Sequence, residues 1–168
     1  WPPTPDSYAF HRRLGVGFYL QGYWAFDVLA DSSVAIEERE SATERVRRIH
    51  TPRGTLVERW AFLAESCSWA PVQRLVRSSA DLPALVYWYA HTDYRPSPTE
   101  ALRRRPLLDE LGIVLCYLPR SPFMELTAVL AGIEHMVAMW QDDTPAFERA
   151  LAAMAESSDR AAAAALEV

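Results

Sequence analysis

The densest group of titratable side chains in this sequence is His91, Asp93 and Tyr94, in the stretch AHTDYR. A histidine close to a carboxylate can act as a general base near neutral pH. The alternative is a solvated connection after a helix, because the spacings of a Ser–His–Asp triad or of a metal site are missing. The missing spacings favour the solvated connection.

A second candidate region contains Arg120, Ser121 and Phe123, between an apolar run and a new helical pattern. Arginine forms bidentate bonds with carboxylates and phosphates, so Arg120 is a candidate for holding an acidic group of a substrate. The alternative is a surface ion pair. Ser121 has the simpler role of a helix N-cap, because Pro122 follows at the first helical position.

One strand, turn and helix must position this second region. The apolar run at residues 113–117, IVLCY, predicts a strand covered on both faces, as in parallel sheets flanked by helices. In α/β proteins, ligands are held where the carboxyl end of such a strand meets the amino end of the next helix. The sequence therefore predicts a functional edge at Arg120 and Ser121.

Residues 34–63 show the period-two pattern of a β-hairpin, and Thr-Pro-Arg-Gly at positions 51–54 predicts its turn. Proline suits the second position of a type I turn, and Gly54 can adopt the positive φ of a bulge. The exposed edge of this hairpin is compatible with a lid over a pocket or with pairing to another subunit. The preceding segment, rich in aromatic residues and glycine, has no clean period and is expected to be irregular or loosely stranded.

Cap signals predict helices elsewhere along the chain. Thr4 and Pro5 begin a short helix that Gly15 ends, and a helix after Asp81 ends near His91. Further helices are expected from about residues 98, 122, 133 and 144, with Pro106 kinking or splitting the first of these. Residues 66–71 are expected to form a linker.

Composition excludes several classes of protein. The 168 residues, half of them apolar, are enough for one sizeable core. A net charge of −5 without a clustered basic face argues against nucleic acid as a partner. All 17 cationic side chains are arginine, so Schiff-base chemistry on a lysine of this chain is excluded.

The cysteines and the apolar segments bear on localisation. Cys67 and Cys116 are far apart and form no C-x-x-C motif, which predicts neither a disulfide framework nor a zinc site. No apolar run of 18 residues and no signal pattern is present, so we expect a cytoplasmic protein without a membrane partner. Because the chain begins with Trp1 and ends in AAAAALEV, we expect it to be a piece of a longer protein.

Three ordered blocks resemble the uroporphyrinogen decarboxylase superfamily, which also contains corrinoid-dependent methyltransferases. They are RIHTPRGTLVERW, then SWAPVQRLVRSSADLPALVYWYAHTDYRP, then IVLCYLPRSPFMELTAVLAGIEHMVAMWQDDTPAFERAL. The resemblance implies an α/β fold, the amino-terminal half of a (β/α)8 TIM barrel. Residues 1–168 would form a single domain with a β-hairpin insertion at 34–63, and residues 113–168 would supply a barrel strand and the helices after it.

The resemblance also implies decarboxylation or methyl transfer on a tetrapyrrole or corrinoid-linked substrate, with no cofactor held within this chain. The residues expected to bind that substrate are Arg120, Ser121, Phe123, His91, Asp93 and Tyr94. In the methyltransferase alternative, zinc would activate a thiol acceptor and a corrinoid would serve as cofactor, with the metal ligands outside this chain. The tyrosine that the decarboxylases place six residues after the proline matching Pro122 is Ala128 here. That substitution favours a third alternative, a non-catalytic binding module that forms a homodimer through the hairpin.

Overall fold

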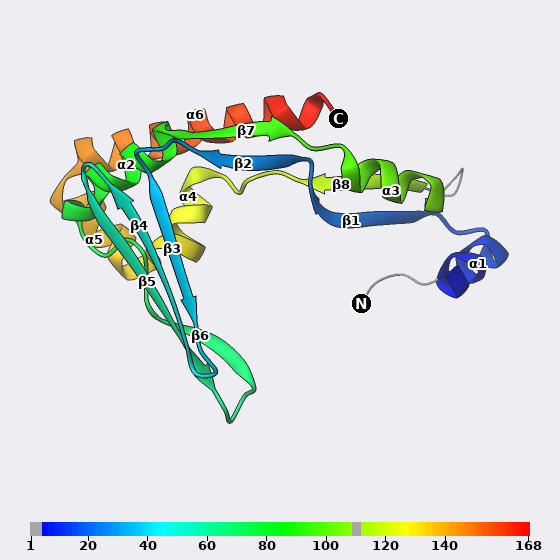
Figure 1. The fold of residues 1–168 in the computed structure, drawn as a ribbon, viewed down its shortest axis with the longest axis horizontal. Helices are drawn as coiled ribbons and strands as arrows, with labels where there is room; N and C mark the ends of the chain where they lie inside the picture. Colours follow the sequence, from blue (N-terminus) through cyan, green and yellow to red (C-terminus); the bar gives the residue numbers. More distant parts are fainter. Residues whose placement is uncertain (1–4, 109–111) are drawn as a thin grey trace. The chain divides into compact units, whose positions relative to one another are not determined.

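The computed structural model describes residues 5–108 and 112–168, which fold into two compact units (Figure 1). The first unit contains Trp1–Val28, Tyr94–Leu118 and Ala161–Val168. The second contains Leu29–Asp93 and Pro119–Arg160. Each unit has its own clusters of buried apolar side chains.

The second unit is built on a four-stranded antiparallel sheet in the order β3-β4-β5-β6. Its strands are β3 (Ala35–Glu40), β4 (Glu44–Thr51), β5 (Gly54–Leu63) and β6 (Ser68–Gln73). Figure 1 shows α2 and α5 beside one end of this sheet, whereas the β5–β6 turn extends away from them. In β4 and β5 the buried residues Ile49 and Leu56 lie directly opposite each other, whereas β3 is exposed along its whole length.

The turn between β4 and β5 is held by Thr51. Its Oγ1 donates a hydrogen bond to the carbonyl oxygen of Gly54 at 2.9 Å and accepts one from the backbone N–H of Arg53 at 3.1 Å. Gly54 has a φ of 140°, which favours glycine because it lacks a Cβ. The hairpin predicted around residues 51–54 is therefore confirmed, and β3 and β6 extend it into a sheet.

Helices bury the apolar face at one end of the sheet. They are η1 (Ser79–Asp81), α2 (Leu82–Ala90), α4 (Pro122–Glu125), η3 (Leu126–Leu130), α5 (Ile133–Asp142) and α6 (Thr144–Leu166). Ile49 and Leu56 of the sheet share one buried cluster with Leu85 of α2. Burial of a side chain of this size contributes about 1.5–3 kcal/mol, so the cluster fixes α2 on the sheet.

The segment η3 is a π-helical stretch that ends before Gly132, so the carbonyl groups of its last residues lack helical donors. The backbone N–H of Ala131 donates to the carbonyl oxygen of Leu126 at 2.8 Å, which is the bond that closes the π turn. Arg74 supplies the missing donors, because its Nη1 donates to the carbonyl oxygens of Ala128 at 3.2 Å and Val129 at 2.9 Å. An arginine from outside the helix thus stabilises this irregular segment.

The first unit contains a two-stranded parallel sheet of β1 (Phe18–Trp24) and β8 (Gly112–Tyr117). The helices α1 (Pro5–Leu14) and α3 (Thr99–Leu108) belong to this unit, together with the last residues of α6. Tyr8 of α1 and Leu108 of α3 are buried together, and Val114 of β8 packs against them. The strands β2 (Phe26–Ala30) and β7 (Thr92–Pro96) form another two-stranded sheet.

The prediction of a TIM barrel, or of half of one, is wrong. In the part of the chain that the structure describes, the sheets have two, two and four strands, and the largest is antiparallel. β8 is not covered on both faces as predicted, because Ile113, Leu115 and Tyr117 are 61%, 40% and 43% exposed. An unbroken apolar run does not itself determine how many faces a strand buries, since neighbouring elements decide this.

Other local predictions have mixed outcomes. α1 ends before Gly15, which has a φ of 63°, and α2 ends at His91 as predicted. Thr4, the predicted N-cap of α1, lies outside the described residues. The prediction of a linker at residues 66–71 is wrong, because β6 begins at Ser68. α3 continues through Pro106 to Leu108 instead of splitting there.

Candidate functional site

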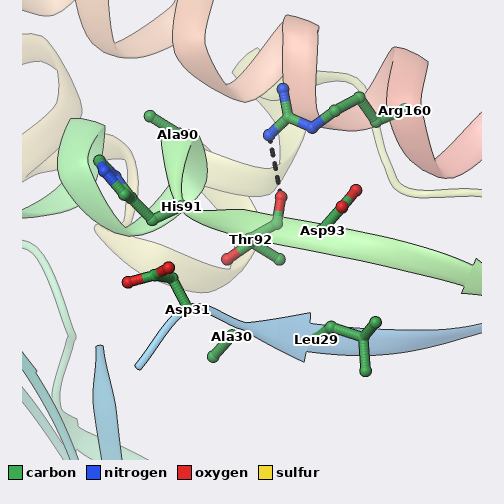
Figure 2. Close-up of a pocket in the computed structure, with 8 residues that line it drawn as sticks. All are labelled: Leu29, Ala30, Asp31, Ala90, His91, Thr92, Asp93 and Arg160. Atoms are coloured by element: carbon green, nitrogen blue, oxygen red, sulfur yellow. Dashed lines mark hydrogen bonds between the residues drawn. The ribbon is translucent and has the colours of Figure 1, made fainter. Parts of the chain in front are cut away.

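The candidate site is a hollow of about 540 Å³ in the second unit, which we call the His91 pocket (Figure 2). It is formed where β2 ends, where α2 passes into β7, and by one arginine of α6. The residues that line it are Leu29, Ala30, Asp31, Ala90, His91, Thr92, Asp93 and Arg160.

His91 is the residue that ends α2. Its imidazole ring stacks on the ring of Tyr87, with centroids 3.8 Å apart and an interplanar angle of 10°. The Nδ1 atom of His91 lies 2.8 Å from the carbonyl oxygen of Tyr87. Since a carbonyl oxygen can only accept, Nδ1 carries the proton of this bond, and Nε2 of the neutral ring is a proton acceptor.

A backbone hydrogen bond holds Asp31 next to His91. The N–H of Asp31 donates to the carbonyl oxygen of His91 at 3.0 Å. Its Oδ1 accepts hydrogen bonds from the hydroxyl of Ser33 at 2.6 Å and from the backbone N–H of Ser33 at 2.8 Å. These bonds, and then the charge of His91, lower the pKa of the Asp31 carboxyl below its ordinary value. The carboxylate is therefore ionised at neutral pH.

A chain of polar contacts joins these two residues to the helix. The hydroxyl of Ser33 lies 2.9 Å from the hydroxyl of Tyr87, the residue on which His91 stacks. Asp31, Ser33, Tyr87 and His91 thus form one connected group. Such a network holds its side chains in fixed orientations.

Arg160 supplies the positive charge of the pocket. Its Nη2 donates to the carbonyl oxygen of Tyr89 at 2.8 Å and to that of Thr92 at 2.9 Å, and Figure 2 shows the second of these bonds. These carbonyls belong to the end of α2 and the start of β7, where the helix leaves acceptors unpaired. The guanidinium has five N–H donors, so this anchoring leaves others able to bind a ligand.

Of the residues that we predicted to bind substrate, only some line the His91 pocket. His91 and Asp93 line the same pocket. Tyr94 does not line it, and its ring packs edge-on against Phe26 at 5.1 Å between centroids. In Figure 2 the side chains of His91 and Asp31 lie on one side of Thr92 and the carboxylate of Asp93 lies on the other.

The residues of the predicted edge at 120–123 lie apart from this pocket. Arg120 is exposed and pairs with Glu125 at 3.3 Å, which is the surface ion pair that was its alternative interpretation. Ser121 occupies the N-cap position of α4 without a side-chain capping bond. Phe123 is 49% exposed. None of the three lines the His91 pocket.

Sequence reasoning missed Asp31 and Arg160. The stretch Asp31-Ser32-Ser33 does contain a signal, because aspartate followed by serine favours a local turn in which the carboxylate accepts backbone N–H groups. Arg160 has no such signal. It lies in a long helix, and only the fold brings it to carbonyls 71 and 68 positions earlier in the chain.

The described residues contain no group of three or more His, Cys, Asp or Glu side chains that could hold a metal ion. Cys67 and Cys116 are free thiols. Within residues 5–108 and 112–168, no helix has both the length and the apolar character needed to cross a bilayer. The zinc and corrinoid expectations therefore remain predictions.

Comparison with known proteins adds no assignment, because no family model, no curated protein and no solved structure matches this chain.

Proposed function

We propose that the His91 pocket binds a small molecule bearing a carboxylate and exchanges a proton with it through His91. The observation that supports this most is the fixed orientation of the imidazole. Nδ1 is held on the Tyr87 carbonyl and the ring on the Tyr87 ring. A histidine held in one tautomer has a defined proton-accepting atom, which general base chemistry requires.

Arg160 is the group of the pocket that suits an acidic ligand, and the carboxylates of Asp31 and Asp93 line the pocket as well. When His91 takes up a proton, the ionised Asp31 compensates the new charge. The guanidinium of Arg160 then remains as the cation available to a ligand, and its planar N–H groups suit a carboxylate. Its bonds to two backbone carbonyls hold it in place before the ligand arrives.

Malonate is a suitable probe, since it is a small dicarboxylate. Calorimetric titrations at pH 7 in two buffers of different ionisation enthalpy measure both its affinity and the protons taken up on binding. We expect proton uptake with the wild-type chain and loss of this uptake in His91→Gln. Arg160→Lys keeps the charge but loses the planar fork, so we expect weaker binding with uptake retained.

His135→Gln is the matched control. The Nδ1 of His135 lies 3.1 Å from the carbonyl oxygen of Ala131, four residues earlier, as in His91. His135 is exposed and does not line the pocket. Malonate binding without proton uptake, or equal uptake in His91→Gln and wild type, would show that the proposal is wrong.

A tetrapyrrole or corrinoid-linked substrate, changed by decarboxylation or methyl transfer, is a second and more specific proposal. It is supported by the three sequence blocks that resemble the uroporphyrinogen decarboxylase superfamily, and by the acidic groups such a substrate presents. Arg160 takes the role first predicted for Arg120, because Arg120 is engaged by Glu125. Fluorescence titration with uroporphyrin tests it, with Arg120→Gln expected to bind as wild type and Arg160→Lys more weakly.

A further inference from the structure

A separate hollow of about 290 Å³ lies at the opposite end of α2, where the β4–β5 turn meets the first turns of α2 and α6. The residues that line it are Arg53, Leu82, Pro83, Val86, Ala146 and Arg149. We call it the Arg53–Arg149 pocket. It belongs to the second unit and shares no residue with the His91 pocket.

The pocket combines an apolar floor with a cationic rim. Leu82 and Ala146 are buried and Val86 is half-buried, so the floor is hydrocarbon. Both arginines are exposed, and among the described residues neither guanidinium forms an ion pair or a hydrogen bond with a side chain. Two cations without a counter-charge beside an apolar surface are complementary to an anion with an apolar body.

The acidic residues nearby do not supply the missing counter-charge. Asp81, just before α2, accepts hydrogen bonds from the backbone N–H groups of Arg77 at 2.8 Å and Ser78 at 3.2 Å. Asp143, just before α6, accepts one from the N–H of Ala146 at 2.9 Å. Neither aspartate lines the pocket. The amino ends of two helices also meet here, and their dipoles add to the attraction for an anion.

We infer that the Arg53–Arg149 pocket binds a small amphipathic carboxylate, with a short hydrocarbon group on Leu82, Val86 and Ala146 and its carboxylate between the two guanidinium groups. Guanidinium is suited to this anion because its N–H groups match the two carboxylate oxygens. The volume is near the lower end of ligand pockets, which limits the hydrocarbon to a short one. The inference does not depend on the function proposed for the His91 pocket.

Octanoate tests this inference directly. In a titration followed by amide NMR, we expect octanoate to shift the signals of residues 82–86 and 146–149. Octanol has the same hydrocarbon without the charge, and acetate has the charge without the hydrocarbon, so we expect both to bind about tenfold more weakly or not at all. Equal affinity for octanol and octanoate would overturn the anion site.

Arg53→Gln and Arg149→Gln test the two cations separately. Each side chain is exposed, so the variants should fold, which circular dichroism verifies. We expect each substitution to weaken octanoate binding about tenfold, because one charge-assisted hydrogen-bonding group is lost. Arg39→Gln removes an exposed arginine from β3 and should bind octanoate as wild type. Wild-type affinity in both pocket variants would contradict the inference.

Discussion

The imidazole of His91 lies parallel to the phenol ring of Tyr87, at a centroid distance of 3.8 Å. The two residues are four positions apart on α2, the spacing that brings side chains together on one helix face. The same spacing allows Nδ1 of His91 to reach the Tyr87 carbonyl. Local helix geometry therefore orients this histidine before any distant residue contributes to the pocket.

Glu100 should titrate well below an ordinary glutamate. Its carboxylate accepts hydrogen bonds from Arg103 at 2.6 Å and from Arg104 at 3.0 Å, and these bonds lower its pKa from 4.5 to about 2. A carboxyl whose pKa is lower in the folded state stabilises that state above its unfolded pKa and loses this effect as pH falls. The contribution should be complete above about pH 5 and lost as pH falls through about 2.

This can be measured by comparing unfolding of the wild type and Glu100→Gln across that pH range. We expect the variant to be less stable at pH 6 and the difference to disappear near pH 2. Salt at about 1 M should reduce the difference at pH 6, because the side chains of Glu100 and Arg103 face solvent. A difference that does not change with pH would show that the carboxylate charge has no role.

Gly54→Ala should destabilise the protein by about 1 kcal/mol or more, because alanine is strained at a positive φ. The φ of Gly54 is 140°, and an added Cβ would lie 3.6 Å from the Cβ of Ala84, an ordinary contact. The cost is therefore conformational rather than steric. Urea denaturation measures it, and Arg53→Ala in the same turn should change stability by less than about 0.5 kcal/mol.

The strain at Gly54 also decides which variant can test whether the hairpin forms a dimer. A variant combining Pro52→Ala with Gly54→Val would weaken the turn itself, so loss of a dimer could reflect unfolding. Arg53→Ala leaves the backbone of the turn unstrained. It is the better variant for comparing oligomeric state by analytical ultracentrifugation.

Arg74→Gln should destabilise the π-helical segment η3. The substitution removes the donor to the carbonyl oxygens of Ala128 and Val129, and a lost hydrogen bond to a charged group costs about 1.5–3 kcal/mol. Amide hydrogen exchange should become faster at Ala131, whose N–H closes the π turn. Arg77→Gln, an exposed neighbour, is the control, and equal exchange in the two variants would contradict a specific role for Arg74.

Arg45 and Trp69 should show a measurable coupling across the sheet. The guanidinium carbon of Arg45 lies 4.1 Å from the centre of the Trp69 ring, within the range of a cation–π interaction. A double-mutant cycle with Arg45→Gln and Trp69→Leu should give about 0.5–1 kcal/mol. Arg45 also forms an ion pair with Glu40 at 2.9 Å. Both the wild type and Trp69→Leu retain this ion pair, so its contribution cancels from the coupling free energy. A coupling near zero would contradict the prediction.

Several local features were predictable because they depend on neighbouring residues alone. The β4–β5 turn follows from Pro52 and Gly54, since proline restricts φ and glycine permits positive φ. The ends of α1 and α2 follow from cap signals at Gly15 and His91. His91 and Asp93, close together in the sequence, line the same pocket.

The remaining features required contacts between distant residues. The apolar run in β8 indicates a strand but not which faces are covered, and one face of that strand is exposed at Ile113. Strand pairing also decides fold class, and the long antiparallel sheet excludes the barrel that the resemblance implied. Arg160 joins the His91 pocket only because α6 places it against the end of α2.

The sequence by itself determined the turn between β4 and β5 and the ends of α1 and α2, because these depend on φ preferences and on spacing along the chain. Only the tertiary structure decided that Asp31 and Arg160 complete the pocket while Arg120 pairs with Glu125. The reason is physical: the charge around a side chain depends on distances through space, which residue order does not specify.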